Sequence, residues 1–92
     1  MTVYLLHFKE PISHAKHYIG WTNDLVGRIM EHSEGRGARI TQVLKERGGT
    51  FALARVWEGK DRAFERHLKS KGKNAPHLCP ICSKNAMKRM EG

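Results

Sequence analysis

The run TVYLLHF at residues 2–8 is the sequence feature that most limits the fold of this chain. It is short and rich in β-branched and aromatic residues, which is typical of a buried or half-buried strand. His7 and Lys9 interrupt its apolar residues, so the segment suits neither a signal-peptide core nor a membrane span. We therefore expect no membrane partner, and a cytoplasmic location is the default expectation.

A second strand is predicted at residues 16–21 (KHYIGW), after polar and turn-forming residues break the first pattern at residues 10–14. The two strands should pair as an antiparallel hairpin with a long loop. Because side chains alternate along a strand, Tyr4 and Tyr18 can both lie on one face of this hairpin.

Helical spacing and capping residues predict the rest of the fold. The remaining predicted elements are helices over residues 24–33 and from about 40 to 47, a strand over residues 50–57 and a helix over residues 62–71. Thr22 and Asn23 are candidate N-caps of the first helix, and Asp61 is a candidate N-cap of the last. The order strand, strand, helix, helix, strand, helix indicates an α+β domain in which helices cover a small sheet.

Length and charge bound the organisation and the partners of the chain. With 92 residues, one domain with a modest core is expected: residues 1–72 hold the predicted elements, and residues 73–92 form a C-terminal extension with a basic tail. The net charge of +8 favours polyanions, because each phosphate contact releases counterions. Nucleic acid is therefore the first partner to test, although lysines that only solvate the surface would give the same charge.

Two residues of the first predicted helix have the chemistry of a phosphate site. Arg28 and His32 are four positions apart, so they project from the same side of the helix, beside its apolar stripe. An arginine can bind a phosphate bidentately, and an imidazole can transfer a proton near neutral pH. Taken alone, the pair is more typical of a surface arginine and a core histidine than of a phosphate site.

Glu65 has two interpretations. It lies four positions before Lys69, which is the spacing of an ordinary solvated ion pair on a helix. If its helix packs on the same face of the sheet as Tyr4 and Tyr18, however, the carboxylate would point into a site with two phenols, an arginine and a histidine. One carboxylate with substrate phosphate oxygens is enough to hold Mg²⁺.

These residues together resemble a known family. The segments Thr2-Val3-Tyr4 and Tyr18-Ile19-Gly20, followed by Arg28, His32 and Glu65 in that order, are similar to the motifs of the GIY-YIG nucleases over residues 2 to about 71. The second motif is intact, whereas Thr2 and Val3 replace the glycine and isoleucine of the first. The resemblance implies a small three-stranded antiparallel sheet flanked by helices, and metal-dependent hydrolysis of phosphodiester bonds in DNA.

The resemblance also implies a role for each residue. Glu65 would bind one Mg²⁺ or Mn²⁺ ion, and Arg28 would bind the scissile phosphate. Tyr18 would act as the base, directly or through a water on the metal, while Tyr4 and His32 would orient water and phosphate. Further positions implied are Gly20, which lets the backbone approach the site and the nucleic acid closely, and Asn74, the nearest candidate for an asparagine that the family places after its glutamate.

Basic residues near these positions predict a groove for the nucleic-acid backbone. Arg36 and Arg39 lie between the first two predicted helices, and Lys69 follows Glu65. The same residues would suit a non-catalytic nucleic-acid-binding module, which is the main alternative to an enzyme. Protein partners are not predicted by these residues.

The C-terminal segment HLCPIC offers a possible zinc site. His77, Cys79 and Cys82 are three candidate ligands, and a closed site would need a fourth from elsewhere, such as His67. Such a site would suit a zinc-stabilised adaptor that binds another protein. The alternative is that both cysteines are reduced thiols that pack the extension against the domain.

Overall fold

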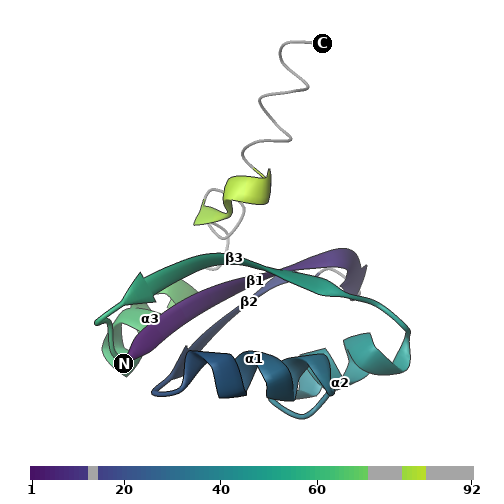
Figure 1. The fold of residues 1–92 in the computed structure, drawn as a ribbon. Coiled ribbons are helices and arrows are strands. Elements are labelled where there is room, and N and C mark those ends of the chain that lie inside the picture. The colour runs from purple at the N-terminus through teal and green to yellow at the C-terminus, as the bar shows by residue number, and fades with distance from the viewer. Residues whose placement is uncertain (13–14, 71–77, 83–92) are drawn as a thin grey trace, which may run out of the picture.

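The computed structural model describes residues 1–12, 15–70 and 78–82. Its elements are β1 (Thr2–Ile12), β2 (Ala15–Thr22), α1 (Leu25–Ser33), α2 (Arg39–Glu46), β3 (Phe51–Glu58) and α3 (Arg62–Ser70). The strands form one antiparallel sheet in the order β2-β1-β3 (Figure 1). The predicted α+β class and the three-stranded sheet flanked by helices are therefore confirmed. Within the described ranges, no helix has the length and apolar character needed to cross a bilayer.

The first strand is longer than the sequence pattern predicts. β1 continues through Pro11 to Ile12, and β2 begins at Ala15, so the expected long loop is wrong. The register with β2 shifts between His7 and Ile12, and pairing with β3 ends at Phe8. Pro11 is tolerated because it lies in this irregular stretch, where a missing N–H breaks no regular ladder bond.

Aspartate side chains cap the starts of α1 and α3. Asp24 caps α1, since its Oδ1 accepts a hydrogen bond of 3.1 Å from the backbone N–H of Gly27. The expectation that Thr22 or Asn23 caps this helix is therefore wrong. Asp61 caps α3 as predicted, because its Oδ1 accepts a bond of 3.2 Å from the N–H of Phe64.

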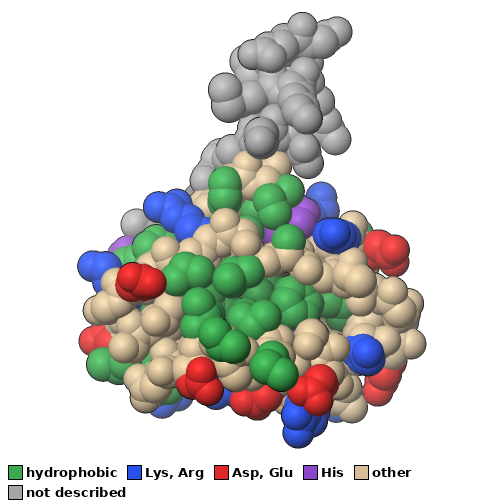
Figure 2. Space-filling model, in the orientation of Figure 1, with side chains coloured by type: hydrophobic (Ala, Val, Ile, Leu, Met, Phe, Trp, Pro, Cys, Tyr) green, Lys and Arg blue, Asp and Glu red, His purple; other side chains and the backbone are tan. Residues whose placement is uncertain are grey.

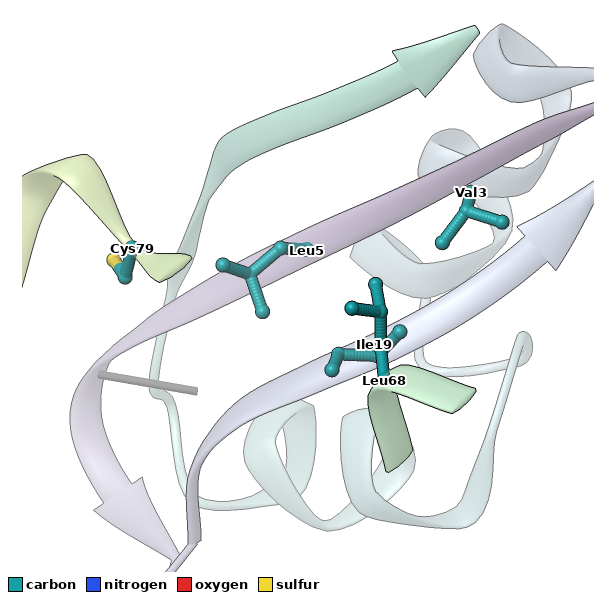
Figure 3. Close-up of a cluster of buried hydrophobic side chains, with 5 residues drawn as sticks. All are labelled: Val3, Leu5, Ile19, Leu68 and Cys79. Carbon is teal, nitrogen blue, oxygen red and sulfur yellow. The ribbon is translucent and has the colours of Figure 1, made fainter. Parts of the chain in front are cut away.

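The sheet separates two apolar clusters, and alternation along β1 supplies both. Val3 and Leu5 pack with Ile19, Leu68 of α3 and Cys79 (Figure 3). The next residues along the strand face the opposite side. This second cluster consists of Tyr4, Leu6, Phe8 and Leu44 of α2, with residues of α1 packed against it. The two faces of β1 therefore pack against different sets of residues.

β3 is one edge of the sheet. The face of the molecule in Figure 2 carries hydrophobic side chains at its centre, with charged side chains around its rim. Leu53 of β3 is one of the exposed large hydrophobic residues.

Candidate active site

The centre of the candidate site is a buried contact between β1 and α1. The hydroxyl of Tyr4 lies 2.6 Å from Nε2 of His32, and both residues are almost completely buried. His32 belongs to the last turn of α1, and Leu25 and Ile29 of the same helix pack on the Tyr4 side of the sheet. Helical spacing therefore turns His32 toward β1.

Thr41 of α2 fixes the tautomer of His32. The Thr41 hydroxyl donates to the carbonyl of Ala38 at 2.8 Å, so its oxygen must accept at the 3.0 Å contact with His32 Nδ1. Nδ1 therefore carries the imidazole proton, and Nε2 accepts the proton donated by the Tyr4 hydroxyl. Hydrogen bonds thus run in one direction from Tyr4 through His32 and Thr41 to the backbone.

The pKa values of Tyr4 and His32 agree with this assignment. Burial lowers the pKa of His32, and the nearby Arg28 guanidinium lowers it further. Burial raises the pKa of the Tyr4 hydroxyl well above its usual value of 10.0, with Tyr18 and Glu65 contributing to the increase. Tyr4 therefore remains a proton donor, and His32 remains a neutral acceptor at Nε2.

Two glycines allow this close packing. Gly20 pairs with Tyr4 across the hairpin, and a Cβ at position 20 would overlap the hydroxyl end of the Tyr4 ring. A Cβ at Gly37 would likewise overlap the His32 ring. Gly20 is buried and lies against the Tyr4 ring.

Tyr18 lies on the same face of the sheet as Tyr4. Its ring centroid is 6.2 Å from that of Tyr4 and 5.3 Å from that of His32. The Nζ of Lys69 lies 5.6 Å from the Tyr18 ring centroid. Among the described residues, none forms a hydrogen bond with the Tyr18 hydroxyl.

Glu65 of α3 is directed into the molecule and not toward bulk solvent. Only 13% of its side chain is exposed, and its Oε2 lies 3.4 Å from Nζ of Lys69. Its carboxylate is also close enough to raise the pKa of Tyr4. The ion pair expected from the sequence is present. The expectation that α3 packs on the same face of the sheet as the tyrosines is wrong, because Leu68 of this helix packs with Val3 and Leu5 on the opposite face. Glu65 is linked to Tyr18 through Lys69, which pairs with the carboxylate and lies over the Tyr18 ring.

Arg28 borders the same site from α1. Its side chain is 35% exposed, and its ionic partner among the described residues is Glu31, at a long distance of 3.8 Å. After burial, the Arg28 guanidinium is a further influence on the Tyr4 hydroxyl and the His32 imidazole, and it lowers the pKa of both groups. It thus combines access from solvent with a position beside the phenol and the imidazole.

A pocket of about 310 Å³ opens on the α2 side of His32. Its walls come from α1, α2 and the start of β3, and they include Ile29, Lys45 and Phe51. The His32–Thr41 contact therefore lies at the boundary between this pocket and the two tyrosines.

The predicted groove residues differ in their availability. Arg36 is exposed and donates two hydrogen bonds to the carboxylate of Glu34, at 3.0 and 3.1 Å. Arg39 is exposed at the start of α2, and Lys69 is held by Glu65. Asn74 lies outside the described residues.

The sequence did not identify every residue of the site. Thr41 and Gly37 were missed, because nothing local distinguishes this threonine or this loop glycine from others. The sequence placed His7 and His17 in the predicted strands, but it did not indicate that their side chains lie near Cys79 and Cys82.

The structure bears on part of the zinc site predicted from HLCPIC. His77 lies outside the described residues, and His67 is exposed on α3. Cys79 and Cys82 are instead grouped with His7 and His17, and the candidate ligand atoms of these four residues all lie within 4.8 Å of one another. The alternation of side chains along the strands could have predicted part of this group. It places His7 on the same face as Leu5 and His17 on the same face as Ile19, opposite the tyrosines.

Comparison with family models matches residues 1–77 to the GIY-YIG catalytic domain. Searches of curated proteins and of solved structures returned no match. The matched segment includes all of the site around Tyr4, Tyr18, Arg28, His32 and Glu65. Because the match covers most of the 92 residues, this chain belongs to the GIY-YIG family, which is a family of nucleases.

Proposed function

We propose that this protein is a divalent-metal-dependent endonuclease that hydrolyses phosphodiester bonds in DNA. One observation carries the proposal: the rings of Tyr4, Tyr18 and His32 lie within 5.3–6.2 Å of one another, and Lys69, which pairs with Glu65, lies over the Tyr18 ring. Acidic, basic and phenolic groups from separate elements therefore converge on one position. A nucleic-acid-binding module would need the arginine but not the shielded carboxylate.

Glu65 fits a hard divalent cation. Mg²⁺ and Mn²⁺ prefer oxygen ligands, and Mg²⁺ is commonly held by one or two carboxylates with waters and substrate phosphate. The Glu65 carboxylate is largely shielded, and its described ionic partner is the half-exposed Lys69. Glu65 would hold the ion, which when bound would polarise the phosphoryl oxygens of the substrate.

Arg28 would bind the scissile phosphate. Its contact with Glu31 is long, so a phosphate can replace it at small cost. A guanidinium can form two parallel hydrogen bonds to phosphate oxygens, and these strengthen as negative charge grows in the transition state.

The two tyrosines are suited to different tasks. Tyr4 donates its proton to His32, and burial raises its pKa, so it would orient a ligand through its oxygen. Tyr18 has no such acceptor among the described residues, and the Lys69 ammonium lies over its ring. Tyr18 is therefore our candidate for the group that removes a proton from the attacking water.

The test is a cleavage assay on single-stranded, duplex and branched DNA and on RNA, with Mg²⁺, Mn²⁺ or EDTA. We expect metal-dependent cleavage of DNA, abolished by Glu65→Gln with most DNA binding retained. Glu46→Gln is the matched control, because Glu46 is exposed at the end of α2. Binding without cleavage by the wild-type protein on every substrate would favour the non-catalytic module, and full activity of Glu65→Gln would exclude the metal role of Glu65.

A further inference from the structure

Four side chains with metal-binding chemistry meet on the face of the sheet opposite the tyrosines. His7 and His17 are paired across the β1–β2 hairpin, and their rings are 5.2 Å apart. Cys79 and Cys82 approach them from the segment 78–82, where Cys79 is completely buried beside Leu5 (Figure 3). Both cysteines are free thiols.

We propose that His7, His17, Cys79 and Cys82 form a structural zinc site. With Zn–N of about 2.05 Å and Zn–S of about 2.3 Å, a tetrahedron has edges of about 3.35 Å between nitrogens and about 3.6 Å between nitrogen and sulfur. His7 Nδ1 lies 3.3 Å from His17 Nε2. The His7 Nδ1 distances to Cys79 Sγ and Cys82 Sγ are 3.5 and 3.6 Å. His17 Nε2 lies 3.3 Å from Cys82 Sγ. Four of the six edges thus agree with a zinc tetrahedron to within about 0.3 Å.

Hydrogen bonds alone do not explain this arrangement. Nδ1 of His7 has three polar neighbours between 3.3 and 3.6 Å away, namely the His17 nitrogen and both sulfurs. An imidazole nitrogen has either one hydrogen or one lone pair in the ring plane, so it can serve one such partner well. A cation at the centre uses the lone pairs of all four groups at once.

Charge also favours a divalent ion. Two thiolates and two neutral imidazoles around Zn²⁺ have no net charge, which suits a site that includes a fully buried sulfur. On binding, the thiols of Cys79 and Cys82 would each lose a proton to the solvent, and each sulfur would use an electron pair to bond the metal. Four protein ligands fill the tetrahedron, so this ion would be structural and not catalytic.

The site would join distant parts of the chain. Cys82 is 65 positions from His17, and Cys79 is 72 positions from His7, so the ion would fasten the segment 78–82 to the hairpin. Small domains with modest cores gain stability from such cross-links. Both cysteines lie beyond residue 77, where the family match ends, and the ligands face away from the tyrosines, so this proposal does not depend on the proposed nuclease activity.

The experiment begins with the full chain purified under reducing conditions without added chelator. Elemental analysis should find about one zinc per chain. Replacement of zinc by Co²⁺ should give the visible absorption of tetrahedral cobalt and a thiolate charge-transfer band. His17→Ala should reduce bound zinc at least about tenfold, as expected when one of four ligands is lost. His67→Ala should leave the zinc content unchanged, because His67 is exposed on α3 and outside the cluster.

Cys82→Ser is the second variant, in case His17→Ala does not fold, because it changes only one atom of a partly buried residue. It should also lose zinc and the charge-transfer intensity. Three results would overturn the proposal: wild-type protein without metal that takes up no added zinc or cobalt, a Cys79–Cys82 disulfide that forms readily in the presence of zinc, or undiminished zinc in both His17→Ala and Cys82→Ser.

Discussion

The hydroxyl of Tyr4 and Nε2 of His32 lie 2.6 Å apart although the residues are separated by 28 positions in the chain. Tyr4→Phe keeps the ring and removes only the donor, which leaves a buried imidazole nitrogen without its partner. We expect the free energy of unfolding to fall by about 1–3 kcal/mol, measured by urea titration. Tyr18→Phe is the control, because no described residue bonds its hydroxyl, and an equal loss in both variants would contradict this account.

Thr41 is expected to stabilise the protein through the proton on His32 Nδ1. Thr41→Val keeps the shape of the side chain but leaves that N–H without its acceptor, so unfolding should become easier by about 1–3 kcal/mol. Thr41→Ser restores the hydroxyl and should recover part of this loss. Thr50→Val, at an exposed position, should change stability little, and the three variants can be compared by urea titration.

The lowered pKa of His32 predicts a dependence of stability on pH. The unfolded chain binds a proton at His32 near pH 6.5, whereas the folded chain binds it only at a lower pH. Between these values the unfolded state holds more protons, so the free energy of unfolding rises with pH. The stabilisation is complete above about pH 6.5 and is lost as the pH falls toward the folded pKa.

Urea titrations across this range should therefore give a steeper slope for the wild-type protein than for His32→Gln. Tyr4, Tyr18 and Arg28 surround the imidazole and remain in both proteins, so the difference isolates His32. Parallel curves would show that His32 does not titrate differently in the folded state.

Gly20→Ala should destabilise the protein because the new methyl group overlaps the Tyr4 ring. Overpacking of this kind costs about 1–3 kcal/mol. In a Tyr4→Ala background the same substitution should cost much less, since the ring is absent. Thermal or urea unfolding of the two single variants and the double variant measures this coupling, and additive effects would show that the two positions are not in contact.

Arg28→Ala should reduce DNA cleavage by about 10²–10³-fold, as expected for removal of one donor to a developing negative charge. Arg28→Lys keeps the charge but not the paired donors, so it should be intermediate. Arg47→Ala is the matched control, because Arg47 is exposed at the C-terminal end of α2. The variants are compared by their single-turnover rates of DNA cleavage at saturating protein concentration. An unchanged rate for Arg28→Ala would show that Arg28 does not act on the scissile phosphate.

The sequence was sufficient to predict features that depend on the local pattern of residues in a strand or helix. The order of strands and helices and the Asp61 cap followed from local spacing, and so did the shared face of Tyr4 and Tyr18. Local signals were weaker at the end of β1, because Pro11 normally ends a strand and only the shifted register lets it remain.

Tertiary structure alone decided which distant groups meet. Thr41 became the partner of His32 because α2 packs beside α1, and no local pattern identifies that threonine. Similarly, alternation placed His7 and His17 on the face away from the tyrosines, but the return of the segment 78–82 to this face brought Cys79 and Cys82 to them. Periodicity determines the direction of a side chain from its own strand or helix, whereas packing between elements determines what it contacts.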